Sequence, residues 1–164
     1  MTPQEIRSLL TDYMIKRPLG VPVEGLQQVA LQENLEQEAY QDSLGNWTIG
    51  VGHTPSYQGE YWSIDKCLSV FWVDITTKGV TPISTVFPWA RGKMSDIRWW
   101  VFVNMAFNMG IGNFLNFHNT INAAQNGDWE ACAEGMRDSI WYHQVGQRGV
   151  ELVQQMLTNK WVLP

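Results

Sequence analysis

Cysteine is scarce in this chain, and its two cysteines do not form a recognisable metal-binding motif. Cys67 and Cys132 are the only cysteines among 164 residues, and they lie far apart in the sequence. One disulfide is arithmetically possible, but the spacing does not match the paired cysteines of a zinc site. We expect buried free thiols, because thiols stay reduced in the cytoplasm, where we expect the protein to be made.

Long hydrophobic runs are also missing. No apolar stretch approaches the roughly 20 residues that a helix needs to cross a bilayer. The first 17 residues lack the continuous apolar core of a signal peptide and carry five charged side chains, namely Glu5, Arg7, Asp12, Lys16 and Arg17. The sequence therefore predicts no stable membrane insertion and a location in the cytoplasm of the cell that makes it.

Positive charge is in short supply. Eleven Lys and Arg residues stand against sixteen Asp and Glu residues, giving a net charge of −5. Nucleic acid is excluded as a partner, because its phosphates require a basic surface. The three histidines, His53, His118 and His143, lack the spacing of metal ligands, so no metal site is expected.

The pattern of apolar residues predicts a mainly helical chain with a small sheet. Hydrophobic residues make up 45% of the sequence, enough for one compact unit or one unit in two lobes. Gly79 and Pro82 are expected to close a helix that starts at Ser63, and residues 109–113 are expected to form a turn. The periodicity predicts helices at 3–17, 23–34, 63–78, 93–109, 119–125, 129–138 and 146–159, with strands within 39–57.

Two carboxylates in different settings mark residues 33–54. Glu33 closes the apolar stripe of the helix at 23–34, so its carboxyl is expected to be partly desolvated. Asp42 lies in a polar turn, where it should stay ionised. A pair of carboxylates in contrasting environments is typical of the catalytic residues of glycoside hydrolases.

A hydroxyl follows the two carboxylates. Residues 43–46 supply turn-forming side chains, and the alternation from Trp47 to Gly52 then predicts a strand. Period two places Trp47, Ile49 and Val51 on one face and Thr48 on the other. Because the residues beside Thr48 are small, we expect its face to be open, as a substrate groove requires.

The arrangement resembles the phage T4-type lysozymes, the endolysin muramidases. Glu33, eight residues, Asp42, five residues, Thr48 and then Ile-Gly-Val-Gly-His match the catalytic segment of that family without a gap. The resemblance covers most of the chain beyond residue 24. It continues through residues 104–110, 129–131, 139–144, Arg148 and 160–161.

The resemblance implies an α+β fold that is mainly α, with two lobes and a small antiparallel sheet beside the active-site cleft. Residues 1–22 would form an extra helix and a linker before a lysozyme domain at 23–164. That domain would comprise a small lobe at 23–62, a crossing helix at 63–78 and a helical lobe at 79–164.

The resemblance also implies roles for single residues. Glu33 would protonate the glycosidic oxygen, Asp42 would orient and activate the attacking water, and Thr48 would help to hold that water. An ion pair between His53 and Asp74 would support the fold rather than take part in the chemistry. The candidates for substrate contact are Phe107, Asn108, Asn119 and Thr120.

The function implied is hydrolysis of the β-1,4 bond between N-acetylmuramic acid and N-acetylglucosamine in peptidoglycan, usually with inversion at the anomeric carbon. No cofactor is implied, and we expect a monomer. Release from the host cytoplasm to the periplasm and cell wall would depend on a holin. Two alternatives remain open at this point: a lytic transglycosylase on the same scaffold, and a non-catalytic wall-binding or virion protein.

Overall fold

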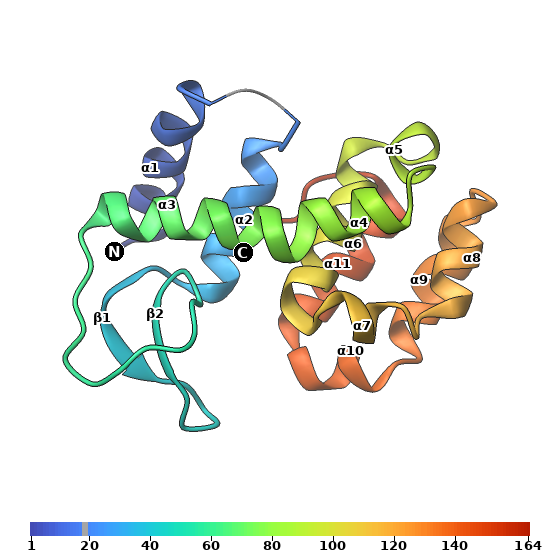
Figure 1. Ribbon diagram of the computed structural model, residues 1–164. Helices are drawn as coiled ribbons and strands as arrows, with labels where there is room; N and C mark the ends of the chain where they lie inside the picture. The colour runs from blue at the N-terminus through green and yellow to red at the C-terminus, as the bar shows by residue number, and fades with distance from the viewer. Residues whose placement is uncertain (18–19) are drawn as a thin grey trace. The chain divides into compact units, whose positions relative to one another are not determined.

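The computed structural model describes residues 1–17 and 20–164, which divide into two compact units, Met1–Thr76 and Thr77–Pro164. Both units are mainly helical (Figure 1). The described residues form one sheet, which has two antiparallel strands. The predicted fold class, α+β and mainly α, is confirmed. The predicted linker includes residues 18 and 19, which lie outside the described residues.

The first unit begins with two helices, continues through a hairpin and ends with a third helix. In chain order its elements are α1 (Pro3–Ile15), α2 (Val23–Glu33), β1 (Glu36–Gln41), β2 (Trp47–Gly50) and α3 (Ile64–Ile75). The second unit follows with α4 (Thr81–Val86), α5 (Ala90–Lys93), α6 (Asp96–Met109), α7 (Ile111–Phe114), α8 (His118–Gln125), α9 (Trp129–Arg137), α10 (Ile140–Val145) and α11 (Gln147–Thr158).

Helix α1 has a well-defined start and one buried face. The Thr2 hydroxyl accepts a hydrogen bond from the Glu5 N–H at 3.2 Å, and the Glu5 carboxylate accepts one from the Thr2 N–H at 2.7 Å. This reciprocal pair is a capping box, which satisfies two backbone donors that a helix start leaves open. The apolar face packs on α2 and buries Ile6, Leu10 and Met14.

The hairpin is built around an antiparallel pairing of Tyr40 with Thr48 and of Gln41 with Trp47. A further segment runs along the outer side of β1: the Ala39 N–H donates to the Glu60 carbonyl at 2.9 Å, and the Trp62 N–H donates to the Gln37 carbonyl at 2.8 Å. Helix α3 packs on both strands. The two strands, at 36–41 and 47–50, begin and end earlier in the chain than the predicted 39–57.

The expected end of the helix at Gly79 and Pro82 is wrong. Helical backbone continues from α3 through a π-helical segment, η1 (Thr76–Val80), into α4, and Figure 1 draws these elements as one run in green. Pro82 lies in the first turn of α4, directly after the π-helical segment. Gly79 fits because a β-carbon there would lie 2.9 Å from the Val103 side chain.

Helix α6 forms the core of the second unit. Eight consecutive residues from Trp99 to Ala106 are buried, so this helix is surrounded on all sides. Its one buried amide, Asn104, is satisfied by the Arg148 guanidinium at 2.8 and 3.0 Å. The predicted central helix at 93–109 is confirmed, although it begins at Asp96.

Two short helices of the second unit differ from the expectations. Residues 109–113 were expected to form a turn, but α7 begins at Ile111 after Gly110, whose φ of +85° makes the bend. Helix α10 was not predicted. Ser139 caps it by accepting a hydrogen bond from the Tyr142 N–H at 3.1 Å. Both helices are too short to show helical periodicity in the sequence.

Candidate active site

Asp42 is held by the turn that it begins. Its Oδ1 accepts hydrogen bonds from the Asn46 N–H at 2.8 Å and the Leu44 N–H at 2.9 Å, and its Oδ2 accepts one from the Asn46 amide at 3.3 Å. These donors, the Asn46 backbone first, lower the pKa of Asp42 below its usual value. The sequence prediction that Asp42 stays ionised agrees with this direction.

Thr48 lies at the start of β2, directly after that turn. Its hydroxyl donates to the Asn46 carbonyl at 3.2 Å, which leaves the oxygen lone pairs able to accept a hydrogen bond. The expectation of an open Thr48 face is wrong, since the residue is only 4% exposed. Tyr40 is its cross-strand partner and lies on the same face of the hairpin.

Glu33 is the last residue of α2 and is half-buried. Burial raises the pKa of Tyr40, and the charges of Glu33, Glu36 and Asp42 raise it further. All three carboxylates are therefore within electrostatic reach of one phenol, whose strand partner is Thr48. Tyr40 is thus paired with Thr48 on the hairpin and feels the charges of Glu33 and Asp42.

His53 and Asp74 are brought together as the sequence predicts. The distance from His53 Nδ1 to Asp74 Oδ2 is 2.6 Å, and the Asp74 side chain is 9% exposed. The His53 ring also packs on Trp62, with ring centroids 5.3 Å apart. This contact links the end of the hairpin to α3, so its geometry fits the structural role predicted for it.

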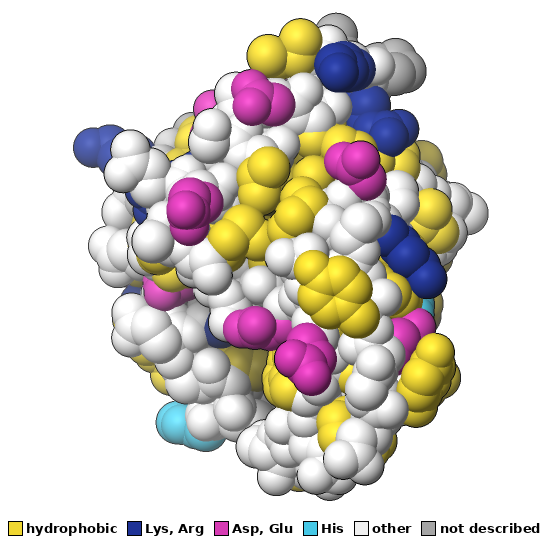
Figure 2. Space-filling view, turned by 90° about the vertical axis from the view of Figure 1, so that its left-hand side faces the viewer, with side chains coloured by type: hydrophobic (Ala, Val, Ile, Leu, Met, Phe, Trp, Pro, Cys, Tyr) yellow, Lys and Arg dark blue, Asp and Glu magenta, His cyan; other side chains and the backbone are white. Residues whose placement is uncertain are grey.

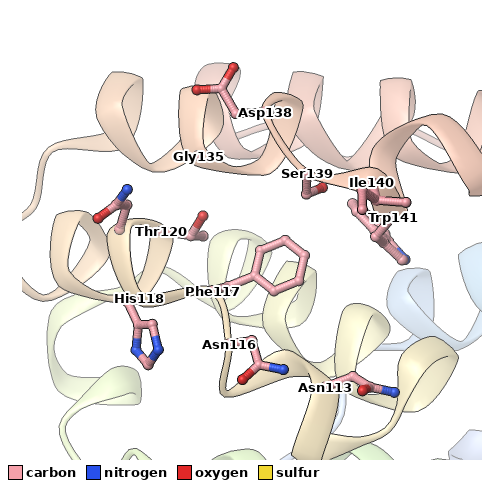
Figure 3. A pocket seen from close by; sticks show the side chains of 11 residues that line it. Asn113, Asn116, Phe117, His118, Thr120, Gly135, Asp138, Ser139, Ile140 and Trp141 are labelled. Carbon is pink, nitrogen blue, oxygen red and sulfur yellow. The ribbon is translucent and has the colours of Figure 1, made fainter.

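Two of the predicted substrate-contact residues line a pocket of the second unit. Asn119 and Thr120 face a hollow of about 610 Å³. Figure 3 shows the Phe117 ring pointing from the start of α8 toward Ser139. The other lining residues are Asn113, Asn116, His118, Gly135, Asp138, Ile140 and Trp141.

The other two predicted residues do not line this pocket. Asn108 is exposed, and its Oδ1 accepts a hydrogen bond at 2.8 Å from Trp141 Nε1, so it supports one wall of the pocket from outside. Phe107 lies against η1, where a β-carbon at Gly79 would be 3.6 Å from the Phe107 Cβ. Phe107 and Asn108 therefore do not line the pocket of Asn119 and Thr120, although Asn108 is hydrogen-bonded to its wall.

The surface charge follows the composition. Figure 2 shows acidic side chains spread over the face that it draws, among apolar and uncharged ones, with Lys and Arg mainly toward its upper and right-hand edges. This distribution fits the net charge of −5 and offers no broad basic surface on that face.

The match to known sequences decides the family. A sequence model described as phage lysozyme matches residues 30–158, a range that includes Glu33, Asp42 and Thr48. The chain belongs to the phage lysozyme family. Membership indicates lysozyme-type glycosidase activity at the level of the family, and α1 precedes the matched range.

The chain is similar to two curated proteins that differ in length. The pre-baseplate central spike protein Gp5 of Enterobacteria phage T4 is 30% identical over 153 residues, covering 77% of this chain and 26% of that protein. The probable T4-type lysozyme 1 of Dictyostelium discoideum is 24% identical over 156 residues, covering 77% of this chain and 89% of that protein. The chain thus spans about a quarter of the length of the first relative.

The described residues also bear on metal binding, membrane crossing and the reactivity of the cysteines. Neither a cluster of three potential metal-ligating side chains nor a helix long and apolar enough to cross a membrane is found among them. Both cysteines are free and buried, as predicted. Burial raises the pKa of the Cys132 thiol to about 12, which keeps it unreactive.

Sequence reasoning missed three residues that shape the first unit's site. Asn46 holds Asp42, Tyr40 lies among the carboxylates, and Gly52 lies against Glu33. Tyr40, two residues before Asp42, and Gly52, directly before His53, could be read from the sequence. The Asn46–Asp42 contact is local to the turn, whereas the approach of Gly52 to Glu33 joins residues far apart in the sequence and depends on tertiary packing.

Proposed function

We propose that this protein is a muramidase that hydrolyses the β-1,4 bond between N-acetylmuramic acid and N-acetylglucosamine in peptidoglycan. Glu33 acts as the general acid and protonates the leaving glycosidic oxygen. Asp42 accepts a proton from the attacking water, and the Thr48 oxygen accepts a second hydrogen bond from the same water. Attack on the face opposite the leaving group gives inversion.

The observation that carries this proposal is the environment of Asp42. Two backbone N–H groups and the Asn46 amide hold its carboxylate, and the same donors lower its pKa. A general base must be ionised at the working pH, and its orientation must be fixed before the water arrives. Glu33, half-buried at the end of α2, is the other carboxyl of the pair and takes the opposite role.

Product analysis tests the proposal. Purified peptidoglycan is digested with the protein, and the released muropeptides are identified by mass spectrometry. Ordinary reducing ends are expected, because water is the nucleophile. Products with anhydro ends would instead assign a lytic transglycosylase, and binding to the wall without release of sugar would assign a non-catalytic wall-binding protein.

The biological setting is also a proposal. We expect a monomer that accumulates in the host cytoplasm and reaches the periplasm and cell wall after a holin opens the membrane, which would make it an endolysin responsible for host cell lysis. Light scattering on the purified protein tests the monomer. Lysis of cells that express the protein with and without a holin tests the route.

One comparison favours a second setting. The T4 relative is named as a central spike protein, and this chain matches about a quarter of it. The same muramidase activity would then serve within a larger particle. Mass spectrometry of purified virions distinguishes the two settings, because an endolysin is absent from the particle and a spike component is present in it.

A further inference from the structure

The Glu33 carboxyl rests against the backbone of Gly52. Gly52 has a φ of +66°, and a β-carbon placed there would lie 2.6 Å from Glu33 Oε2 and 3.0 Å from Glu33 Cδ. Atoms of folded proteins do not approach a β-carbon that closely. Glu33 therefore occupies a space that exists only because residue 52 is glycine.

Gly52 belongs to a tight turn, residues 49–53. The Ile49 N–H donates to the His53 carbonyl at 3.0 Å, and the His53 N–H donates to the Ile49 carbonyl at 2.9 Å. On its other side the turn packs on Trp62, since a β-carbon at Gly50 would lie 3.1 Å from the Trp62 ring. The backbone that faces Glu33 is thus closed by two hydrogen bonds and supported by an indole.

Three side-chain contacts fix the turn and its support. His53 Nδ1 lies 2.6 Å from Asp74 Oδ2, which fastens the end of the turn to α3. Trp62 Nε1 donates to Glu60 Oε1 at 2.7 Å, and the Ser56 hydroxyl donates to Glu60 Oε2 at 2.8 Å. The indole is therefore held in place by a carboxylate that is itself held by a second donor.

We propose that Gly52 is a positioning residue for Glu33, and that the turn at 49–53, clamped to α3 through His53 and Asp74, is the fixed surface that sets the direction of the Glu33 carboxyl. This inference rests on the proposed function, in which Glu33 donates a proton to the glycosidic oxygen. Proton donation requires the acid within hydrogen-bond reach of that oxygen. A displacement of the carboxyl by about 1 Å lowers the rate by up to about a hundredfold.

A double-mutant cycle tests the contact between the two residues. Gly52→Ala, Glu33→Asp and the double variant are compared in kcat and KM on a soluble peptidoglycan fragment. We expect Gly52→Ala to lower kcat by about tenfold or more with little change in KM. In the Glu33→Asp background the carboxyl is one methylene shorter, so the added methyl has room. There Gly52→Ala should lower kcat by less than about threefold.

Equal losses in the two backgrounds would overturn the inference, because a purely structural role of Gly52 costs the same with either acid. Gly59→Ala is the matched control. Gly59 has a φ of +85°, and a β-carbon there would meet nothing within 4 Å. This variant carries the same kind of backbone strain without touching Glu33, and its kcat should equal that of the wild type.

Asp74→Asn supplies a second route if Gly52→Ala does not fold. It removes the charge that clamps His53, and it is assayed at a temperature where circular dichroism shows it folded. A lower kcat at unchanged KM supports the clamp, and an unchanged kcat overturns it. A wild-type protein that releases no sugar overturns the proposed function itself, whereas an active wild type with an additive cycle overturns only the role of Gly52.

Discussion

In the first unit, the hydrogen bonds that hold Asp42 come from residues no more than four positions away. In the second unit, the pocket is lined by residues from two segments, one between 113 and 120 and one between 135 and 141, which meet where α8 packs on α9. The two regions also differ in how many hydrogen-bond partners their polar side chains have. The Asp42 carboxylate has three donors, whereas Thr120 Oγ1 is buried with no hydrogen-bond partner among the described residues.

This difference teaches where each region is sensitive to change. A site made by a local turn keeps its geometry as long as the turn forms, so its variants should alter activity more than stability. A pocket made by packing of helices depends on side-chain volume, so its variants should alter stability first. Four predictions sharpen this comparison.

The largest effect is expected for Asp42→Asn. The asparagine oxygen can still accept from the Asn46 and Leu44 N–H groups, so the turn should survive. The base is lost, and kcat should fall by about a hundredfold. Muropeptide release measured beside thermal unfolding checks both parts, with the exposed Asp12→Asn as control. Retention of more than about a tenth of the activity would contradict the assignment of Asp42 as the base.

The next prediction compares how much two ion pairs, one in each unit, contribute to the free energy of unfolding. Asp74→Ala leaves His53 without the carboxylate at 2.6 Å and should lower the free energy of unfolding by about 2 kcal/mol. Glu134→Ala removes an exposed pair with Arg137 in α9 and should cost less than about 0.5 kcal/mol. Urea denaturation of both variants gives the comparison, and equal losses would show that burial does not distinguish the two pairs.

A smaller change in the opposite direction is expected at Thr120, which is 1% exposed. Thr120→Val replaces an unpartnered buried hydroxyl with a methyl of similar shape, and should stabilise the protein by about 1 kcal/mol. If Thr120 contacts substrate, KM should rise in the same variant. Thermal unfolding and a KM measurement check the two effects. A loss of stability would mean that the hydroxyl is satisfied in solution.

The smallest effect is expected for Asn46→Ala, which removes one donor from Asp42 and keeps the backbone N–H. The pKa of Asp42 is lowered in the folded protein, so its contribution to stability is present above the unfolded value of about 3.9 and is lost as the pH falls through the folded value. With the amide gone, the pKa should rise, and the acid limb of the activity profile should move to higher pH. A pH–rate profile checks this, and an unmoved limb would assign that limb to another group.

The same comparison explains what could be predicted from sequence. The spacing of Glu33, Asp42 and Thr48 is local, so the segment and the polar turn at Asp42 were accessible. The partner of His53 lies 21 residues away, and it was predicted only from the family resemblance. The burial of Thr48 was not accessible, because burial depends on tertiary packing and not on the alternation of residues along one strand. The continuation of α3 through η1 was hidden by Gly79 and Pro82, whose usual role as helix breakers gave way to packing on Val103 and to a place in the first turn of α4.

The pocket in the second unit shows more clearly what could not be predicted from the sequence. Asn119 and Thr120 were found by resemblance, but Phe117, Asp138 and Ser139 enter the pocket only through packing between helices. Helix α10 carries no periodic signal in six residues, so the helix itself was not predicted. No local pattern encodes contacts of this kind.

The measurement that tests the central claim most directly compares sugar release from purified peptidoglycan by the wild type, Glu33→Gln and Glu38→Gln. Glu38 is an exposed carboxylate on β1, the strand that follows α2, so it controls for loss of a negative charge in this part of the first unit. We predict that Glu33→Gln loses at least about a hundredfold in rate while Glu38→Gln keeps the wild-type rate. Equal rates for the two variants would contradict the assignment of Glu33 as the general acid.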